Sequence, residues 1–251
     1  MFCEIKDVFK TKRGILIILS MLTIAISAYL NLITVKYIMI GNFSVSFGTL
    51  FISFLPMITS ELMSECYGWK KGFVISSLAY TVCFIFTLLL WGSTYIPGMV
   101  FVGPDAMFAT EAYNLLFSAS PIILISSAVA YYIGIFFNCY IMGKLKDRAD
   151  RYGDSKGKLF KRFALSTLVG QTLDNAIFFA IPALFMTWGA TYLDNWNYVW
   201  QQTVAALVIE VVYEVVFFVV TSYLVKKINN MPEGVTIMVD KDTREVTNII
   251  N

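Results

Sequence analysis

Histidine is absent from the 251-residue chain, and charged residues make up only 14% of it. Without histidine, the chain lacks the usual proton shuttle of enzymes and the most common metal ligand. This absence excludes a Ser-His-Asp or Cys-His catalytic site, and any zinc site that uses histidine. A Gly-x-x-x-x-Gly-Lys-Ser/Thr phosphate loop is also missing, so the chain cannot hydrolyse ATP by that route. We therefore expect neither an enzyme nor a bound cofactor.

Cysteine is scarce and scattered. The four cysteines are Cys3, Cys66, Cys83 and Cys139, which lie far apart in the sequence. None of them falls in a predicted outer loop. A disulfide framework or a cysteine-based metal site is therefore not expected.

Apolar residues make up 58% of the chain, whereas soluble domains contain roughly 45–50%. They gather in six long runs, at residues 14–35, 44–64, 72–92, 119–142, 163–188 and 198–225. Each run is long enough to cross about 30 Å of hydrocarbon as a helix that rises about 1.5 Å per residue. We predict an all-α, polytopic membrane protein, with a bundle of six transmembrane helices in residues 1–227 and a short polar tail in residues 228–251. Pro56 and Pro182 fall inside predicted helices and are expected to kink them.

Lysine and arginine alternate between the connecting segments. They precede the first run, follow the sixth, and occupy the loops after the second and fourth runs. The other loops, at residues 37–43, 93–118 and 189–197, contain neither residue. This pattern predicts that both termini are cytoplasmic, in the cytoplasmic (inner) membrane. The basic loop after the fourth run is explained by topology and by contact with anionic lipid, so we expect no nucleic-acid partner.

Two connecting segments have further features. The outer loop at residues 93–118 contains two prolines and two glycines, and it is either a lid over the outer mouth or a simple connector. The alternating residues 235–246 of the tail are compatible with a small hairpin.

Several ionisable residues fall inside the predicted membrane helices, where each costs roughly 2.5–3.5 kcal/mol to insert. Spacing of i, i+3 and i+4 places them on shared helix faces. Some of these acids must be protonated, hydrogen-bonded or exposed to a water-filled cavity, because one lysine cannot neutralise them all. The candidate binding residues are Asn31, Lys36, Glu61, Gln171, Asp174, Asn175, Phe178, Glu210, Tyr213 and Glu214.

The alternative is that such residues only hold helices together. We favour that alternative for Asn138 and Ser166, and a functional role for Asp174 with Glu210. Lys36 either meets a carboxylate in the cavity or extends to the outer surface. Aromatic residues such as Phe178 and Tyr213 can stack on a flat ligand, although packing or lipid contact is their more common role.

Three segments carry a resemblance to a known family. They are residues 31–36 (NLITVK), 54–68 (FLPMITSELMSECYG) and 170–178 (GQTLDNAIF), followed by Glu210 and Glu214 before a basic end. Over residues 14–227 the chain resembles the vitamin-uptake-transporter-like family of queuosine precursor transporters, the YhhQ-type membrane proteins. It departs from the family pattern at Glu61, where an aspartate is expected. It also departs at Asn138, where the family often has a Gln-x-x-Asp-like pattern. Gly134 and Asn138 have the same spacing as Gly170 and Asp174.

The resemblance implies import of 7-deazaguanine bases such as preQ0, preQ1 or queuine. A carboxylate accepts the paired N–H groups of a guanine-like edge well, and amide side chains suit its carbonyl side. The alternative is a substrate-capture subunit for a vitamin-like molecule, which needs a separate ATP-driven module. The first helix lacks a clear Ala-x-x-x-Ala pair for docking such a module, which favours action alone. The precursor carried, the coupling ion and a homodimer all stay open.

Overall fold

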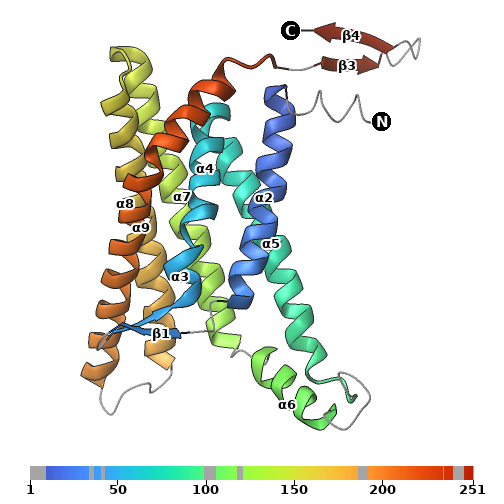
Figure 1. The fold of residues 1–251 in the computed structure, drawn as a ribbon, viewed down its shortest axis with the longest axis vertical. Helices are drawn as coiled ribbons and strands as arrows, with labels where there is room; N and C mark the ends of the chain where they lie inside the picture. The colour runs from blue at the N-terminus through green and yellow to red at the C-terminus, as the bar shows by residue number, and fades with distance from the viewer. Residues whose placement is uncertain are drawn as a thin grey trace.

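The computed structural model describes residues 10–33, 37–40, 43–98, 106–117, 121–185, 192–233, 235–239 and 246–250. Its helices are α2 (Lys12–Ile33), α3 (Phe47–Phe51), α4 (Phe54–Tyr67), α5 (Trp69–Ser93), α6 (Ala106–Phe117), α7 (Pro121–Tyr152), α8 (Lys156–Phe185) and α9 (Tyr192–Asn229). Two short antiparallel pairs accompany them, β1 (Tyr37–Ile40) with β2 (Phe43–Ser46), and β3 (Val235–Val239) with β4 (Val246–Ile250). The fold is therefore a helical bundle with two small hairpins, the second of which lies in the polar tail (Figure 1).

Five helices among the described residues are long and apolar enough to cross a membrane. These spans are Lys12–Leu30, Trp69–Ser93, Leu124–Tyr152, Lys156–Leu184 and Trp196–Asn229. They correspond to the first, third, fourth, fifth and sixth predicted runs. Their outward faces carry exposed apolar side chains such as Leu89 and Val219, which suits contact with lipid.

The second predicted run is not one continuous helix. It is divided into β2, the short α3 and the 14-residue α4. The break follows from Pro56, which has no N–H to donate to the carbonyl of Ile52. The N–H of Leu55 donates to that carbonyl instead, at 3.0 Å, while the N–H of Ser53 donates back to Gly48 at 2.9 Å.

Pro56 consequently lies in the first turn of α4, where a missing N–H is tolerated. The prediction that it kinks a helix from within is wrong. Pro182, in contrast, does lie inside a helix, α8.

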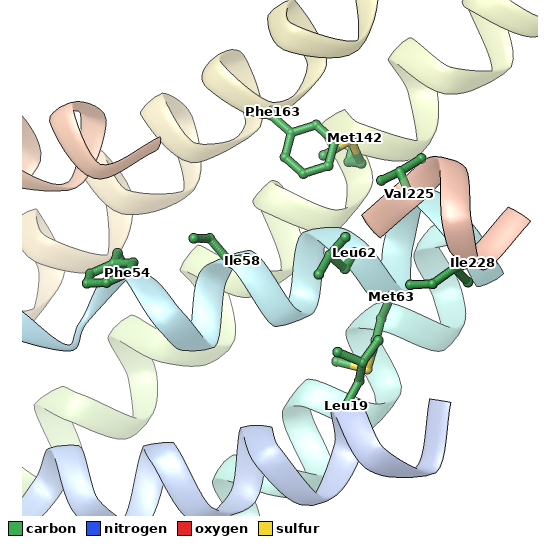
Figure 2. Packing of buried hydrophobic residues seen from close by; sticks show 9 residues of the cluster. All are labelled: Leu19, Phe54, Ile58, Leu62, Met63, Met142, Phe163, Val225 and Ile228. Carbon is green, nitrogen blue, oxygen red and sulfur yellow. The ribbon is translucent and has the colours of Figure 1, made fainter. Parts of the chain in front are cut away.

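Helix α4 lies at the centre of the bundle and packs against α2, α5, α7 and α9 (Figure 1). Apolar side chains of α4 pack with those of four other helices, α2, α7, α8 and α9, as Figure 2 shows: Leu19, Phe54, Ile58, Leu62, Met63, Met142, Phe163, Val225 and Ile228. At about 1.5 Å per residue, 14 residues are too short to cross the hydrocarbon region alone. A short helix with an irregular start is tolerated at membrane depth where protein surrounds it, because no lipid meets its unpaired backbone groups.

The basic segments share one end of the bundle. The start of α2, the turn between α7 and α8 and the end of α9 lie at this end, whereas β1 and α6 lie at the other (Figure 1). The N–H of Lys12 donates to the carbonyl of Pro232 at 2.9 Å, and the Lys12 ammonium pairs with Glu233 at 2.9 Å. This arrangement is the one that the alternation of basic loops requires. We call this end the basic end.

Candidate functional site

A cavity of about 150 Å³ lies between α2, α4, α5, α7, α8 and α9. Its lining residues are Ser27, Leu30, Ser53, Pro56, Met57, Tyr80, Ser127, Tyr131, Gly134, Ile135, Gln171, Asp174, Asn175, Phe178, Phe179 and Glu210. The volume is below the roughly 300–1,000 Å³ of sites for drug-sized molecules, so the cavity suits a small ligand. Ser53 and Pro56, at the break before α4, both line its wall.

Two acidic side chains face this cavity. Glu210 is buried and accepts a hydrogen bond from the Asn175 amide at 3.0 Å, and the Ser53 hydroxyl also bonds to it. Within the described part of the chain, no donor partners the Asp174 carboxylate. A carboxylate without a donor in a narrow cavity is a strong acceptor for the N–H groups of a ligand.

Aromatic rings form two walls of the cavity. Tyr80 and Tyr131 stack with ring centroids 4.2 Å apart and planes 14° from parallel. Phe178 and Phe179 meet edge to face, with centroids 5.1 Å apart. The tyrosine hydroxyls are fixed by Ser127, at 2.6 Å from Tyr80, and by the Ser76 carbonyl, at 3.2 Å from Tyr131. The cavity therefore combines flat apolar surfaces with acidic groups.

A second polar cluster, the Glu61–Glu214 cluster, lies in the bundle but does not line the cavity. It consists of Glu61 from α4, Asn138 from α7, Ser166 and Thr167 from α8, and Glu214 from α9. The Thr167 hydroxyl lies 2.6 Å from Glu61 and 3.4 Å from Glu214. The Asn138 amide and the Ser166 hydroxyl each reach Glu61 at 3.1 Å. These bonds connect four helices.

A third polar cluster closes the basic end. The buried Arg162 guanidinium binds both carboxylate oxygens of Glu65, at 2.9 and 3.2 Å, and both oxygens of Asp154, at 2.9 and 3.0 Å. Lys146 donates to the carbonyl of Glu65. The hydrogen bond from Arg162 holds the pKa of Asp154 below its ordinary value. Because every charge here has a partner, the cluster links α4, α7 and α8 without leaving an isolated buried ion.

The structure brings half of the sequence-predicted binding residues to the cavity: Gln171, Asp174, Asn175, Phe178 and Glu210. Glu61 and Glu214 belong to the separate cluster described above. Tyr213 stacks on Phe54 at 4.1 Å and donates to the Leu50 carbonyl at 2.5 Å, so it supports the broken segment instead. The side chain of Asn31 and all of Lys36 lie outside the described residues.

Asn138 and Ser166 are the two polar residues that we expected to hold helices together. Asn138 and Ser166 make contacts between helices, as the alternative interpretation predicts. The cavity residues that sequence reasoning missed are chiefly Tyr80, Tyr131 and Ser53. The sequence signal that could have identified the two tyrosines is a hydroxyl-bearing ring in the middle of an apolar run.

The described residues contain no group of three or more His, Cys, Asp or Glu side chains that could hold a metal ion.

The α6 helix lies in the predicted outer loop, and its Tyr113 hydroxyl is 2.7 Å from Ser93 of α5. Its residues are not among those that line the cavity.

Fold and cavity together define a multi-pass membrane protein with a small acidic site enclosed by its helices. A family model described as "Putative vitamin uptake transporter" matches residues 46–225, and the chain belongs to this transporter family. No curated protein and no solved structure gives a match. The matched segment begins directly before α3 and contains every cavity residue except Ser27 and Leu30.

Proposed function

We propose that this protein imports queuosine precursors, 7-deazaguanine bases such as preQ0, preQ1 or queuine, across the cytoplasmic membrane. The observation that carries the proposal is the Asp174 carboxylate, which has no partner among the described residues and faces a cavity with flat aromatic walls. A guanine-like edge presents adjacent N–H groups, which a carboxylate accepts as a pair of charge-assisted hydrogen bonds. The ring then lies between the Tyr80–Tyr131 wall and Phe178.

The other polar groups of the cavity fit the rest of such a base. Gln171 and Asn175 supply amide donors for its carbonyl oxygen. Glu210 provides a second carboxylate, which favours a precursor that carries an aminomethyl cation. Support for transport in general comes from the family, and support for this substrate comes from the resemblance of residues 54–68 and 170–178 to queuosine precursor transporters.

The test is growth of a bacterium that can neither make nor import queuosine precursors. The full chain is expressed in it, each candidate base is supplied, and queuosine is measured in transfer RNA. Queuosine should return with at least one base, and it should be lost in Asp174→Asn but kept in Asp150→Asn, a control at an exposed position of α7. Membrane-inserted protein that restores no queuosine with any base would contradict the proposal.

A purified sample separates independent transport from the capture-subunit alternative. Proteoliposomes that contain only this chain should take up the precursor without ATP. Uptake that requires an added ATP-hydrolysing module would favour the alternative.

A further inference from the structure

The carboxyl groups of Glu61 and Glu214 lie deep inside the bundle, and both are closed off from solvent. Their exposed fractions are 0% and 3%. Both reach the hydroxyl of Thr167, at 2.6 Å and 3.4 Å, so the two acids share one hydrogen-bond donor. That hydroxyl has a single hydrogen, which it can give fully to only one of them.

The cluster has fewer hydrogen-bond donors than acceptors. Glu61 Oε2, Glu214 Oε1 and Asn138 Oδ1 are buried acceptors without a donor among the described residues. The Ser166 hydroxyl, 3.1 Å from Glu61, is only 2.7 Å from the carbonyl of Arg162, so its one hydrogen is contested. Buried acceptors in proteins are almost always satisfied, so neighbouring acceptors without a donor indicate that the cluster binds a further hydrogen, water or ion.

No described cation compensates the pair. Arg162, one turn before Ser166 on α8, is engaged by Glu65 and Asp154. Lys146, on α7, is directed to Glu65. Cys139 on α7 also interacts with Glu61, and its thiol contributes no positive charge. Two carboxylates without a counter-ion at low dielectric cannot both stay ionised.

We infer that Glu61 and Glu214 hold one shared proton, and that this proton site couples the movement of solute to a proton gradient. A proton placed on one carboxyl group supplies the missing donor and reduces the charge of the pair from −2 to −1. Carboxyl pairs that share one proton in this way occur where like charges lie too close to ionise together. The inference rests on the proposed transport function but not on which solute is carried.

The position of the pair explains how it acts on the cavity. Glu214 lies one helical turn from Glu210 on α9, and Thr167 lies one turn from Gln171 on α8. Glu61 is on α4, whose first turn lines the cavity. The protonated pair ties α4 to α9. Loss of the proton leaves two like charges, which push these helices apart and bias the bundle toward a second arrangement.

A proton fits the cluster better than a sodium ion. Hard cations require oxygen atoms directed at them. Among the described residues, only three oxygens of the cluster lack a donor, fewer than the roughly six that a hard cation takes. Thr167 and Asn138 direct an O–H and an N–H at Glu61. Hydrogen-bond donors directed at an acid are what a hydrogen-bonded carboxyl pair requires.

The first experiment needs no solute. Infrared spectra of the purified full-length protein should contain a protonated-carboxyl band at neutral pH. The double variant Glu61→Gln/Glu214→Gln should lose one carboxyl group's share of it, because neither acid is then left to hold the proton. Glu111→Gln, at an exposed position of α6, should keep the band unchanged. An unchanged band in the double variant would show that the pair holds no proton, and it would overturn the inference even if transport is demonstrated.

The second experiment measures coupling. Proteoliposomes of the wild-type protein enclose a pH-sensitive dye, and preQ1 is added outside. Proton entry should accompany the base, should be abolished in Glu61→Gln and Glu214→Gln, and should persist in Glu111→Gln. Uptake of preQ1 driven by sodium and indifferent to pH would overturn the inference. Absence of preQ1 uptake from the wild type would count against the proposed substrate, and the infrared result would still decide the proton site.

Discussion

Gly134 of α7 lies directly against Asp174 of α8, so closely that a Cβ atom on the glycine would be 2.7 Å from the Cβ of the aspartate. The contact is repeated in reverse one turn away, where a Cβ on Gly170 of α8 would be 2.7 Å from the Cβ of Asn138 of α7. Small residues allow membrane helices to approach closely. The pairs Gly134/Asn138 and Gly170/Asp174 have equal spacing in the sequence, and each glycine contacts the polar residue of the other pair. This packing places Asp174 in the cavity and Asn138 beside Glu61.

This contact predicts that Gly134→Ala destabilises the protein. The new methyl group would also come within 2.9 Å of the Gly170 carbonyl, so α7 and α8 would have to separate. Overpacking of this kind costs about 1–3 kcal/mol. The control is Gly92→Ala in α5, where an added Cβ meets nothing within 4 Å. Thermal unfolding of the two purified variants should show a lower midpoint for the first only, and equal midpoints would contradict the close approach.

Removing either acid of the cavity should impair uptake. Asp174→Asn and Glu210→Gln each eliminate a charge-assisted hydrogen bond worth about 1.5–3 kcal/mol, which corresponds to a roughly 10- to 100-fold loss. The measurement is initial uptake of labelled precursor, normalised to the amount of protein in the membrane. The exposed Asp150→Asn serves as the matched control. Wild-type uptake in both cavity variants would show that these acids do not bind the precursor and serve only as contacts between helices.

The ion pair at the basic end predicts a dependence of stability on pH. The pKa of Asp154 is lowered from its ordinary value of 3.8, chiefly by the hydrogen bond from Arg162. A lowered pKa in the folded state stabilises the protein above the ordinary pKa, and this contribution is lost as the pH falls through the folded-state value. Since Asp154 is about half exposed, with a side-chain exposure of 48%, the effect is small, about 0.2–1 kcal/mol.

Asp154→Asn should therefore lower the thermal midpoint at neutral pH, and the difference from wild type should shrink below pH 3.8. Asp147→Asn, which is exposed on α7, should show no such convergence. A constant difference between Asp154→Asn and wild type across the acid range would argue against the ion pair as its cause.

Orientation in the membrane is tested by labelling. Tyr95 follows α5 and is 70% exposed, and Ser155 lies between α7 and α8. The end of α5 and the turn between α7 and α8 lie at opposite ends of the bundle (Figure 1). A membrane-impermeant maleimide applied to intact cells should label Tyr95→Cys and should not label Ser155→Cys until the cells are opened. The reverse pattern would mean that the basic end faces outward.

Short-range periodicity explains what could be predicted from the sequence. Five membrane helices and the stripe from Gln171 to Phe178 depend on repeats within one segment, so they are visible without knowledge of the fold. The break before α4 was not visible, because a proline in an apolar run either kinks a helix or begins one. Only the packing around Pro56 decides between the two.

The sequence also could not show that the buried acids divide into two sites, the cavity and the Glu61–Glu214 cluster. Counting residues gives the depth of a side chain in the membrane but not the direction in which its helix is turned. Glu61 and Glu214 were therefore grouped with Asp174 and Glu210. Tyr80 was missed for a related reason, since its place in the cavity depends on how α5 meets α7.

Selectivity between purines tests the proposed role of the cavity carboxylates. Guanine shares the N–H edge of a 7-deazaguanine, so it should compete detectably with a labelled precursor. Adenine presents a different order of donors and acceptors, which would set a carboxylate lone pair against an acceptor in a narrow cavity. A site built on hydrogen bonds rejects such a ligand strongly, because its buried polar groups are left unpaired. Adenine should then compete at least about tenfold more weakly, since a mismatch of about 1.4 kcal/mol already has that effect. Equal inhibition by the two purines would contradict edge recognition by carboxylates and would assign binding chiefly to stacking on Tyr80, Tyr131 and Phe178.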